Sequence, residues 1–114
     1  MAKKERRPWG SFYNLEEGLE YKVKTLVINP RSRISLQLHQ HRDEVWVVVS
    51  GRGRVIKGNK VFGIDKKTCP ITIHAGVRHK ISNPFAEPLI IAEVQRGKEC
   101  TEEDIIRIED DYQR

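Results

Sequence analysis

Short β-type segments separated by turn residues constrain the fold of this chain more than any other feature. Runs rich in Val and Ile alternate with pairs that favour turns, such as Asn29-Pro30 and Gly58-Asn59. Helical periodicity is nearly absent. The pattern predicts an all-β barrel or sandwich of about eight strands, a spacing typical of a jelly-roll barrel. The predicted strands cover residues 21–29, 33–41, 44–50, 53–57, 60–64, 69–74, 79–82 and 89–95.

The two ends of the chain are predicted to differ from this barrel. Residues 1–20 contain Pro8 and Gly10 in a mixed sequence and are expected to form an irregular arm. Near the other end, Thr101 precedes a run of acidic residues and is a potential N-cap, which predicts a short C-terminal helix. A chain of 114 residues is long enough for one domain, so we expect a single domain over 1–114.

Charge and apolar patterning narrow the range of partners. The formal net charge is +5, but the basic residues are spread along the chain without interleaved aromatic side chains, so nucleic acid is not an expected partner. No apolar run approaches the ~20 residues that span a bilayer, and the N-terminal sequence lacks an apolar signal region. We therefore expect no membrane partner and a cytoplasmic protein. Cys69 and Cys100 are expected to be reduced thiols without a chemical role.

Side-chain alternation on two predicted strands distinguishes a polar face, where a functional site is expected, from apolar faces that are expected to pack. Because alternate residues of a strand face opposite sides, one face of strand 33–41 is polar and the other apolar. The polar face consists of Ser35, Gln37, His39 and His41, and the apolar face of Ile34, Leu36 and Leu38. Strand 44–50 is apolar on both faces apart from Glu44, as expected for a strand covered on both sides. A chain this short has too little material to cover both, so we expect a homodimer.

The polar face and a later histidine form a candidate metal site. His39 and His41, two residues apart, would place two imidazoles about 7 Å apart on one side of a strand, and Glu44 follows after a bend. His79 begins another strand after a turn at Gly76. Three imidazoles and a carboxylate suit one divalent ion (Mn, Fe, Co, Ni or Zn) and leave positions open for substrate or water. Taken alone, two histidines spaced like His39 and His41 on a strand are more often a solvent-facing or hydrogen-bonded pair than a set of metal ligands.

Two motifs in the chain resemble the signature motifs of the cupin superfamily. The first covers residues 39–51, and the second covers residues 76–83. In cupins, two histidines and a glutamate of the first motif and a histidine of the second bind one metal ion inside a double-stranded β-helix. The resemblance therefore implies a cupin-type barrel in which one divalent ion is held by His39, His41, Glu44 and His79.

Further segments resemble one family within the cupins. They cover residues 7–11, 21–24, 34–37, 39–51, 75–79, 93–97 and 109–114. Together they are similar to the cupin domain of type II phosphomannose isomerases, which is often the C-terminal half of a bifunctional mannose-1-phosphate guanylyltransferase. The resemblance implies a metal-dependent isomerase that interconverts mannose 6-phosphate and fructose 6-phosphate, in the supply of GDP-mannose. The sequence departs from the family at Val45 and Gln113, where histidine and glycine are usual.

An aldose–ketose isomerase needs a base, a group that stabilises the developing oxyanion and cationic contacts for the phosphate. The candidates for the base are Glu44, Lys24 and Glu93. The candidates for substrate binding are Arg7, Arg42, Arg78, Gln95 and Arg96. Arg42 and Arg78 adjoin predicted metal ligands in sequence, so alternation turns them away from the ligand face unless a bend redirects them.

Two other functions remain alternatives. A sugar-phosphate-binding or regulatory cupin would keep the pocket without turnover. Val45 favours this alternative, as does the lack of a glycine-rich nucleotide loop in this sequence. A metal-dependent oxygenase would use the same histidines and carboxylate to bind iron, but the family resemblance over nearly the whole chain argues against it.

Overall fold

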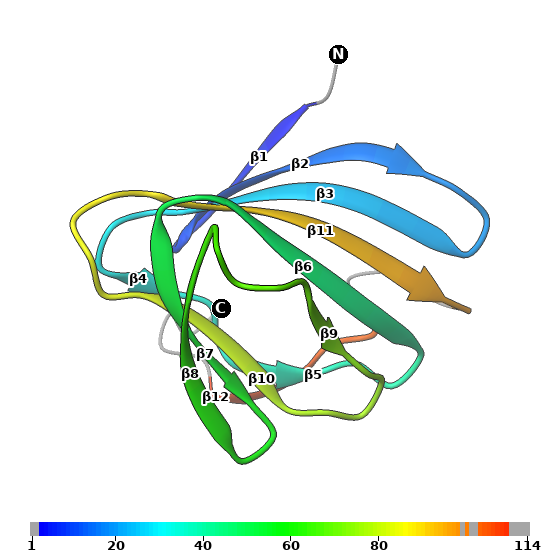
Figure 1. The fold of residues 1–114 in the computed structure, drawn as a ribbon. Helices are drawn as coiled ribbons and strands as arrows, with labels where there is room; N and C mark the ends of the chain where they lie inside the picture. Colours follow the sequence, from blue (N-terminus) through cyan, green and yellow to red (C-terminus); the bar gives the residue numbers. More distant parts are fainter. Residues whose placement is uncertain (1–2, 99, 101–102, 110–114) are drawn as a thin grey trace.

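A computed structural model of the chain describes residues 3–98, 100 and 103–109. In this part of the chain all regular structure is β, and the strands form two antiparallel sheets that face each other (Figure 1). The first sheet contains, in spatial order, β1 (Lys4–Arg7), β2 (Gly10–Glu17), β3 (Tyr21–Ile28), β11 (Leu89–Gly97), β6 (Arg42–Ser50) and β9 (Ile71–Ile73). The second contains β12 (Ile106–Glu109), β5 (Leu36–Leu38), β10 (His79–Asn83), β7 (Arg52–Lys57) and β8 (Lys60–Asp65), with β4 (Ser32–Arg33) paired to β10. The predicted all-β architecture is confirmed.

Three central strands of the first sheet divide the interior into an apolar end and a polar end. Since alternate residues face inward, the inward residues can be read along each strand. The apolar ones are Leu26 and Ile28 on β3, Trp46 and Val48 on β6, and Leu89 and Ile91 on β11. The polar ones are Lys24 on β3, Arg42 and Glu44 on β6, and Glu93 and Gln95 on β11. The antiparallel register aligns the polar ends, with Glu93 opposite both Lys24 and Trp46.

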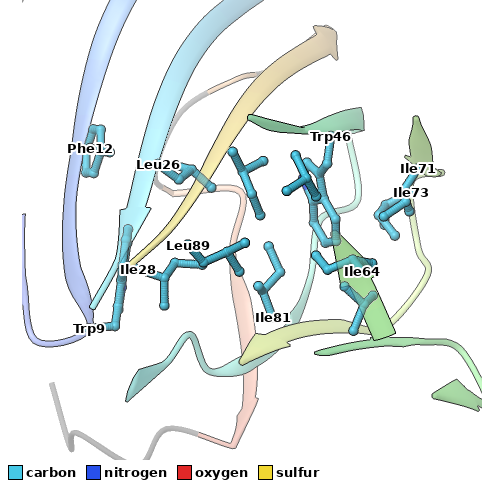
Figure 2. Packing of buried hydrophobic residues seen from close by; sticks show 13 residues of the cluster. Trp9, Phe12, Leu26, Ile28, Trp46, Ile64, Ile71, Ile73, Ile81 and Leu89 are labelled. Atoms are coloured by element: carbon cyan, nitrogen blue, oxygen red, sulfur yellow. The ribbon is translucent and has the colours of Figure 1, made fainter. Parts of the chain in front are cut away.

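Side chains from both sheets fill the apolar end. In the close view of Figure 2, Ile28 and Leu89 of the first sheet lie across from Ile64 and Ile81 of the second. These side chains are almost completely buried. Removal of such apolar surface from water is the main favourable contribution to folding, so this end stabilises the barrel and leaves the other end for polar chemistry.

The N-terminal segment is not the irregular arm that the sequence predicts. Residues 4–7 and 10–17 form β1 and β2, which extend the first sheet beyond β3. Trp9 and Phe12 are buried in the core and anchor these strands. Gly10 is required at the turn between them: its φ is +153°, and a Cβ there would lie 2.0 Å from the carbonyl oxygen of Val27.

The C-terminal segment also differs from its prediction. None of the described residues is helical, and residues 103–109 form a turn followed by β12, which pairs with β5. Thr101, the predicted cap, lies outside the described residues. The alternation of Ile106 and Ile108 suits a strand, and the Asp104 carboxylate binds the backbone of another segment instead of capping a helix. No helix in the described part of the chain is long and apolar enough to cross a membrane.

The outer face of the first sheet carries exposed apolar side chains. Val47 and Val49 on β6 and Val94 on β11 are all exposed. The alternation that places Trp46 and Val48 in the core turns Val47 and Val49 outward, and Val94 faces outward because it lies between inward-facing Glu93 and Gln95. A homodimer that covers this face remains a prediction.

Asn83, from the second cupin-like motif, is expected to stabilise the barrel without touching the site. Its buried amide nitrogen donates to the carbonyl oxygens of Ile28 at 3.1 Å and Glu87 at 2.7 Å, and its amide oxygen accepts from the Phe85 N–H at 3.0 Å. Replacing Asn83 by Ala leaves these groups without partners, so we expect urea denaturation to show a loss of about 2 to 4 kcal/mol in the free energy of unfolding. The neighbouring Ser82→Ala variant, which removes only a solvent-exposed contact, should change it by less than about 0.5 kcal/mol. Equal losses for the two variants would contradict this role.

Candidate functional site

A pocket of about 80 Å³ lies at the polar end between the two sheets. Its volume is sufficient for several water molecules. The polar and charged residues that line it are Arg7, Lys24, Ser35, Gln37, His39, Arg42, Glu44, His79, Lys80, Glu93, Gln95 and Arg107. Cationic side chains outnumber the carboxylates in this lining, so the pocket favours an anionic ligand.

Two histidines present unprotonated nitrogens to one carboxylate. His39 Nδ1 lies 2.6 Å from the carbonyl oxygen of Asp104, and His79 Nδ1 lies 3.0 Å from that of Val77. A carbonyl oxygen only accepts hydrogen bonds, so in each ring the proton is on Nδ1 and the lone pair is on Nε2. The Nε2 atoms lie 3.1 Å and 3.9 Å from the carboxylate oxygens of Glu44.

Burial keeps both imidazoles neutral. Desolvation, and after it the charge of the nearby Arg42 guanidinium, lower the pKa of His39 to about 4. Desolvation also lowers the pKa of His79. Two neutral imidazoles and a carboxylate are a donor set that divalent transition metals bind, and the potential ligand atoms of His39, Glu44 and His79 lie within 4.8 Å of one another.

His41, predicted as a further ligand, is not part of this cluster. Residues 39–41 do not continue strand β5 but form a bend, and the His41 side chain is exposed. The Asp104 carboxylate holds this bend by accepting hydrogen bonds from the N–H groups of Gln40 at 3.0 Å and His41 at 2.9 Å. The bend interrupts the alternation on which the prediction depends, so His39 points inward and His41 outward.

The sequence analysis placed Gln37 on the polar face of strand 33–41 but did not single it out as a site residue. Gln37 is buried, lines the pocket and pairs with His79 in the register of β5 and β10. Its Nε2 atom donates to the carbonyl oxygen of Ser35 at 3.3 Å. Alternation already places Gln37 on the face of His39, so the pair of inward residues two positions apart is Gln37 and His39, not His39 and His41. An amide oxygen is a possible metal ligand, but it is a weaker signal in a sequence than an imidazole.

The three candidates for the base come together in the pocket. Lys24, Glu44 and Glu93 are all buried and line it. The Trp46 indole N–H lies 3.2 Å from a Glu44 oxygen and 3.3 Å from a Glu93 oxygen, so it bridges the two carboxyl groups. Burial and then the charge of Glu44 raise the pKa of Glu93 to about 8, which means that Glu93 carries a proton at neutral pH.

Gln95, predicted as a substrate contact, also lies in the pocket beside Glu93. It is fully buried, and its Nε2 atom lies 3.4 Å from a Glu93 oxygen. Its Oε1 atom has no hydrogen-bond partner among the described residues. A buried acceptor without a partner is unfavourable, so Gln95 is suited to accept a hydrogen bond from a ligand hydroxyl.

The predicted arginines divide into two groups. Arg42 and Arg7 line the pocket, whereas Arg78 and Arg96 are exposed and are not among its lining residues. Arg42 faces inward because it lies two residues before Glu44 on β6 and so shares its face. Arg96 follows inward-facing Gln95 on β11 and therefore faces outward, where it lies 3.7 Å from Asp43. Alternation along the observed strands β6 and β11 thus explains why Arg42 faces the pocket and Arg96 faces solvent.

Two cations that line the pocket were not predicted. Arg107 comes from β12, an edge strand of the second sheet, and Lys80 comes from β10. Arg7 lies on β1, the edge strand of the first sheet, and is stacked on the Phe12 ring at 4.8 Å. Arg107 was missed because its segment was expected to follow a helix rather than to pair with β5.

A double-stranded β-helix with a His/Glu/His cluster at the polar end of its interior defines the cupin class of proteins. A solved structure of similar fold, a Klebsiella pneumoniae protein with a double-stranded β-helix domain, matches 95% of the chain and 86% of its own length with a TM-score of 0.74 at 20% sequence identity. The capsular polysaccharide assembling protein CapF from Staphylococcus aureus matches 96% of the chain and 35% of its own with a TM-score of 0.80 at 16% identity.

Within this class the chain belongs to the family described as mannose-6-phosphate isomerase C-terminal, whose model matches residues 1–110. It is 40% identical to the xanthan biosynthesis protein XanB of Xanthomonas campestris over 95% of the chain and 23% of that protein. It is 39% identical to the mannose-1-phosphate guanylyltransferase ManC of Salmonella typhimurium over 100% of the chain and 24% of that protein. The chain spans about a quarter of the length of these relatives.

The protonation of His39 is testable without any ligand. Because its pKa is lowered to about 4 and its Nδ1 proton is donated to Asp104, the ring should remain neutral at pH 5.5, with the proton on Nδ1. Long-range ¹H–¹⁵N NMR spectra, with the His39→Gln variant used to assign the signals, measure this directly. Nitrogen shifts of an imidazolium ion at pH 5.5 would contradict the buried, neutral ring.

Proposed function

We propose that this protein binds a sugar phosphate together with one divalent metal ion and interconverts mannose 6-phosphate and fructose 6-phosphate. The observation that carries the proposal is the convergence of a neutral His/Glu/His donor set and a protonated Glu93 in one pocket that cationic side chains surround. The family to which the chain belongs supports the choice of reaction.

The donor set fits a divalent ion. The Nδ1 protons of His39 and His79 are donated to backbone carbonyls, which fixes both rings and leaves the Nε2 lone pairs facing Glu44. Backbone contacts of this kind orient histidine ligands in metal sites. His39, Glu44 and His79 would hold the ion, and Gln37 is near enough in the strand register to add an amide oxygen. When bound, the ion would supply a Lewis acid that polarises the sugar carbonyl.

The chain's own residues would move the protons. The reaction transfers a proton between neighbouring carbons through an enediol and also changes which oxygen carries hydrogen. Glu93 holds a proton at neutral pH and would donate it to a sugar oxygen. Glu44 and Lys24, which are buried beside it, are the candidates for the base that acts at carbon.

The phosphate would be held by the edge strands. Arg7 and Arg107 line the pocket from β1 and β12, one edge strand of each sheet, and Arg107 is exposed to solvent. Guanidinium groups suit phosphate because they donate parallel hydrogen bonds. The sugar would then extend inward toward Gln95, whose oxygen lacks a partner.

The departure from the family at Val45 does not favour the alternative of a sugar-phosphate-binding or regulatory cupin without catalytic activity. Val45 is opposite Val94 and Thr72 in the first sheet and precedes inward-facing Trp46, so it faces away from the pocket. Histidine at this position would therefore face away as well. Gln113, the other departure, lies outside the described residues. An isomerase assay that couples fructose 6-phosphate formation to a dehydrogenase, run with each divalent metal, separates the isomerase from the binding protein.

The metal site predicts that His39 and His79 bind the ion and that His41 does not. Equilibrium dialysis against Co²⁺ followed by elemental analysis should find about one ion per chain for the wild type and for His41→Ala. The variants His39→Ala and His79→Ala should bind at least tenfold more weakly, because each removes a donor atom from the cluster. Loss of binding in His41→Ala, or retention in His79→Ala, would contradict this ligand set.

The phosphate contacts yield a second pair of variants. Loss of one charged hydrogen-bond partner costs about 1.5 to 3 kcal/mol, so Arg107→Ala and Arg7→Ala should bind mannose 6-phosphate roughly ten- to a hundredfold more weakly in calorimetry. Mannose itself should bind all variants alike. Arg96→Ala, which removes an exposed arginine outside the pocket, is the matched control and should bind like the wild type. If Arg96→Ala loses binding and the other two do not, the phosphate lies elsewhere.

A further inference from the structure

We propose that Arg42 competes with the divalent metal ion for the donor atoms of Glu44 and His39, and thereby sets the metal affinity of the site. The inference rests on the metal ion of the proposed function. It assigns to Arg42 a role other than the phosphate contact that the sequence suggests.

The contacts of Arg42 involve the same atoms that a metal ion would use. Its Nη2 atom lies 3.0 Å from Glu44 Oε2 and 3.2 Å from His39 Nε2, and its Nε atom lies 3.1 Å from the same Glu44 oxygen. His39 Nε2 carries a lone pair because the ring proton is on Nδ1, where it is donated to Asp104. The guanidinium therefore donates to the His39 lone pair and to the carboxylate at once.

Arg42 cannot leave these atoms without cost. Its side chain is 4% exposed, and its guanidinium is a buried positive charge. A buried charge is tolerated where it is paired and hydrogen-bonded, and Glu44 provides both for Arg42. A divalent ion bound to Glu44 and His39 would break these hydrogen bonds and place a second positive charge beside the guanidinium, which like-charge repulsion disfavours.

The fold places Arg42 in this position independently of any ligand. Arg42 and Glu44 are alternate residues of β6, so both side chains face the interior. The bend at residues 39–41, held by Asp104, turns His39 back toward them. The histidine, the carboxylate and the guanidinium are thus set by one short segment, and we expect the affinity for metal to depend on Arg42 more than on any other cation of the lining.

The test compares Co²⁺ affinity in variants of the 114-residue chain. Arg42→Gln keeps a hydrogen-bonding side chain and removes the charge, whereas Arg42→Lys keeps the charge and loses the forked geometry. We expect equilibrium dialysis to give Arg42→Gln a Kd for Co²⁺ at least tenfold lower than the wild type, with Arg42→Lys closer to the wild type. Arg96→Gln removes one positive charge from an exposed site 3.7 Å from Asp43 and controls for the change in net charge; its Kd should match the wild type.

A second readout does not depend on the affinity measurement. Without metal, Arg42→Gln should melt at a lower temperature than the wild type, because Glu44 loses its charged partner. Saturating Co²⁺ should raise the melting temperature of Arg42→Gln more than that of the wild type, since tighter binding to the folded state stabilises it more. Arg42→Lys provides the same comparison if Arg42→Gln does not fold: its Co²⁺-induced shift should exceed that of the wild type by a smaller amount.

The outcomes separate this inference from the proposed function. A wild type that binds Co²⁺ while Arg42→Gln binds it equally or more weakly would overturn the competition and leave the metal site intact. Absence of Co²⁺ binding in every variant would overturn both. Tighter binding in Arg42→Gln without any isomerase activity in the wild type would support the competition and overturn the proposed reaction.

Discussion

The structure depends on the burial of charged groups at one end of a small barrel. Burial of a charged side chain is unfavourable unless partners replace the lost hydration. Glu44 meets this condition through Arg42 and the Trp46 indole, and Glu93 meets it by holding a proton. These contacts hold the side chains of the candidate site in defined positions. The apolar end, where Ile28 and Leu89 are fully buried, supplies the stability that offsets the cost of burying the charged groups.

Asp104, which lies outside the strands, decides which histidine faces the pocket. The Asp104 carboxylate accepts hydrogen bonds from the N–H groups of Gln40 and His41, and the backbone carbonyl oxygen of Asp104 accepts one from His39 Nδ1–H. A single residue thus shapes the bend and also fixes the tautomer of the histidine that the bend presents. Asp104 consequently belongs to the candidate site rather than to a helix.

The sequence predicts most strands because their signals are local. The segments that became β3, β6, β7, β8, β10 and β11 were each recognised to within two residues at either end. Strand 33–41 was predicted as continuous but is divided into β4 and β5, since its ends are set by contacts with β10 and Asp104. β1, β2 and β12 were not recognised, because strands at or next to a sheet edge depend on pairing with their neighbours more than on their own composition.

The sequence by itself determined the all-β class, the family and the types of residue that meet in the pocket, since alternation and motif spacing are properties of neighbouring residues. Only the tertiary structure decided that His41 turns away from the face it was predicted to share with Gln37 and His39, and that Arg107 and not Arg96 lines the pocket. The first outcome depends on a contact between His39 and Asp104, which lie 65 positions apart, and the second on the pairing of β12 with β5. Contacts over such separations form only when the sheets assemble, so no local pattern in the sequence contains them.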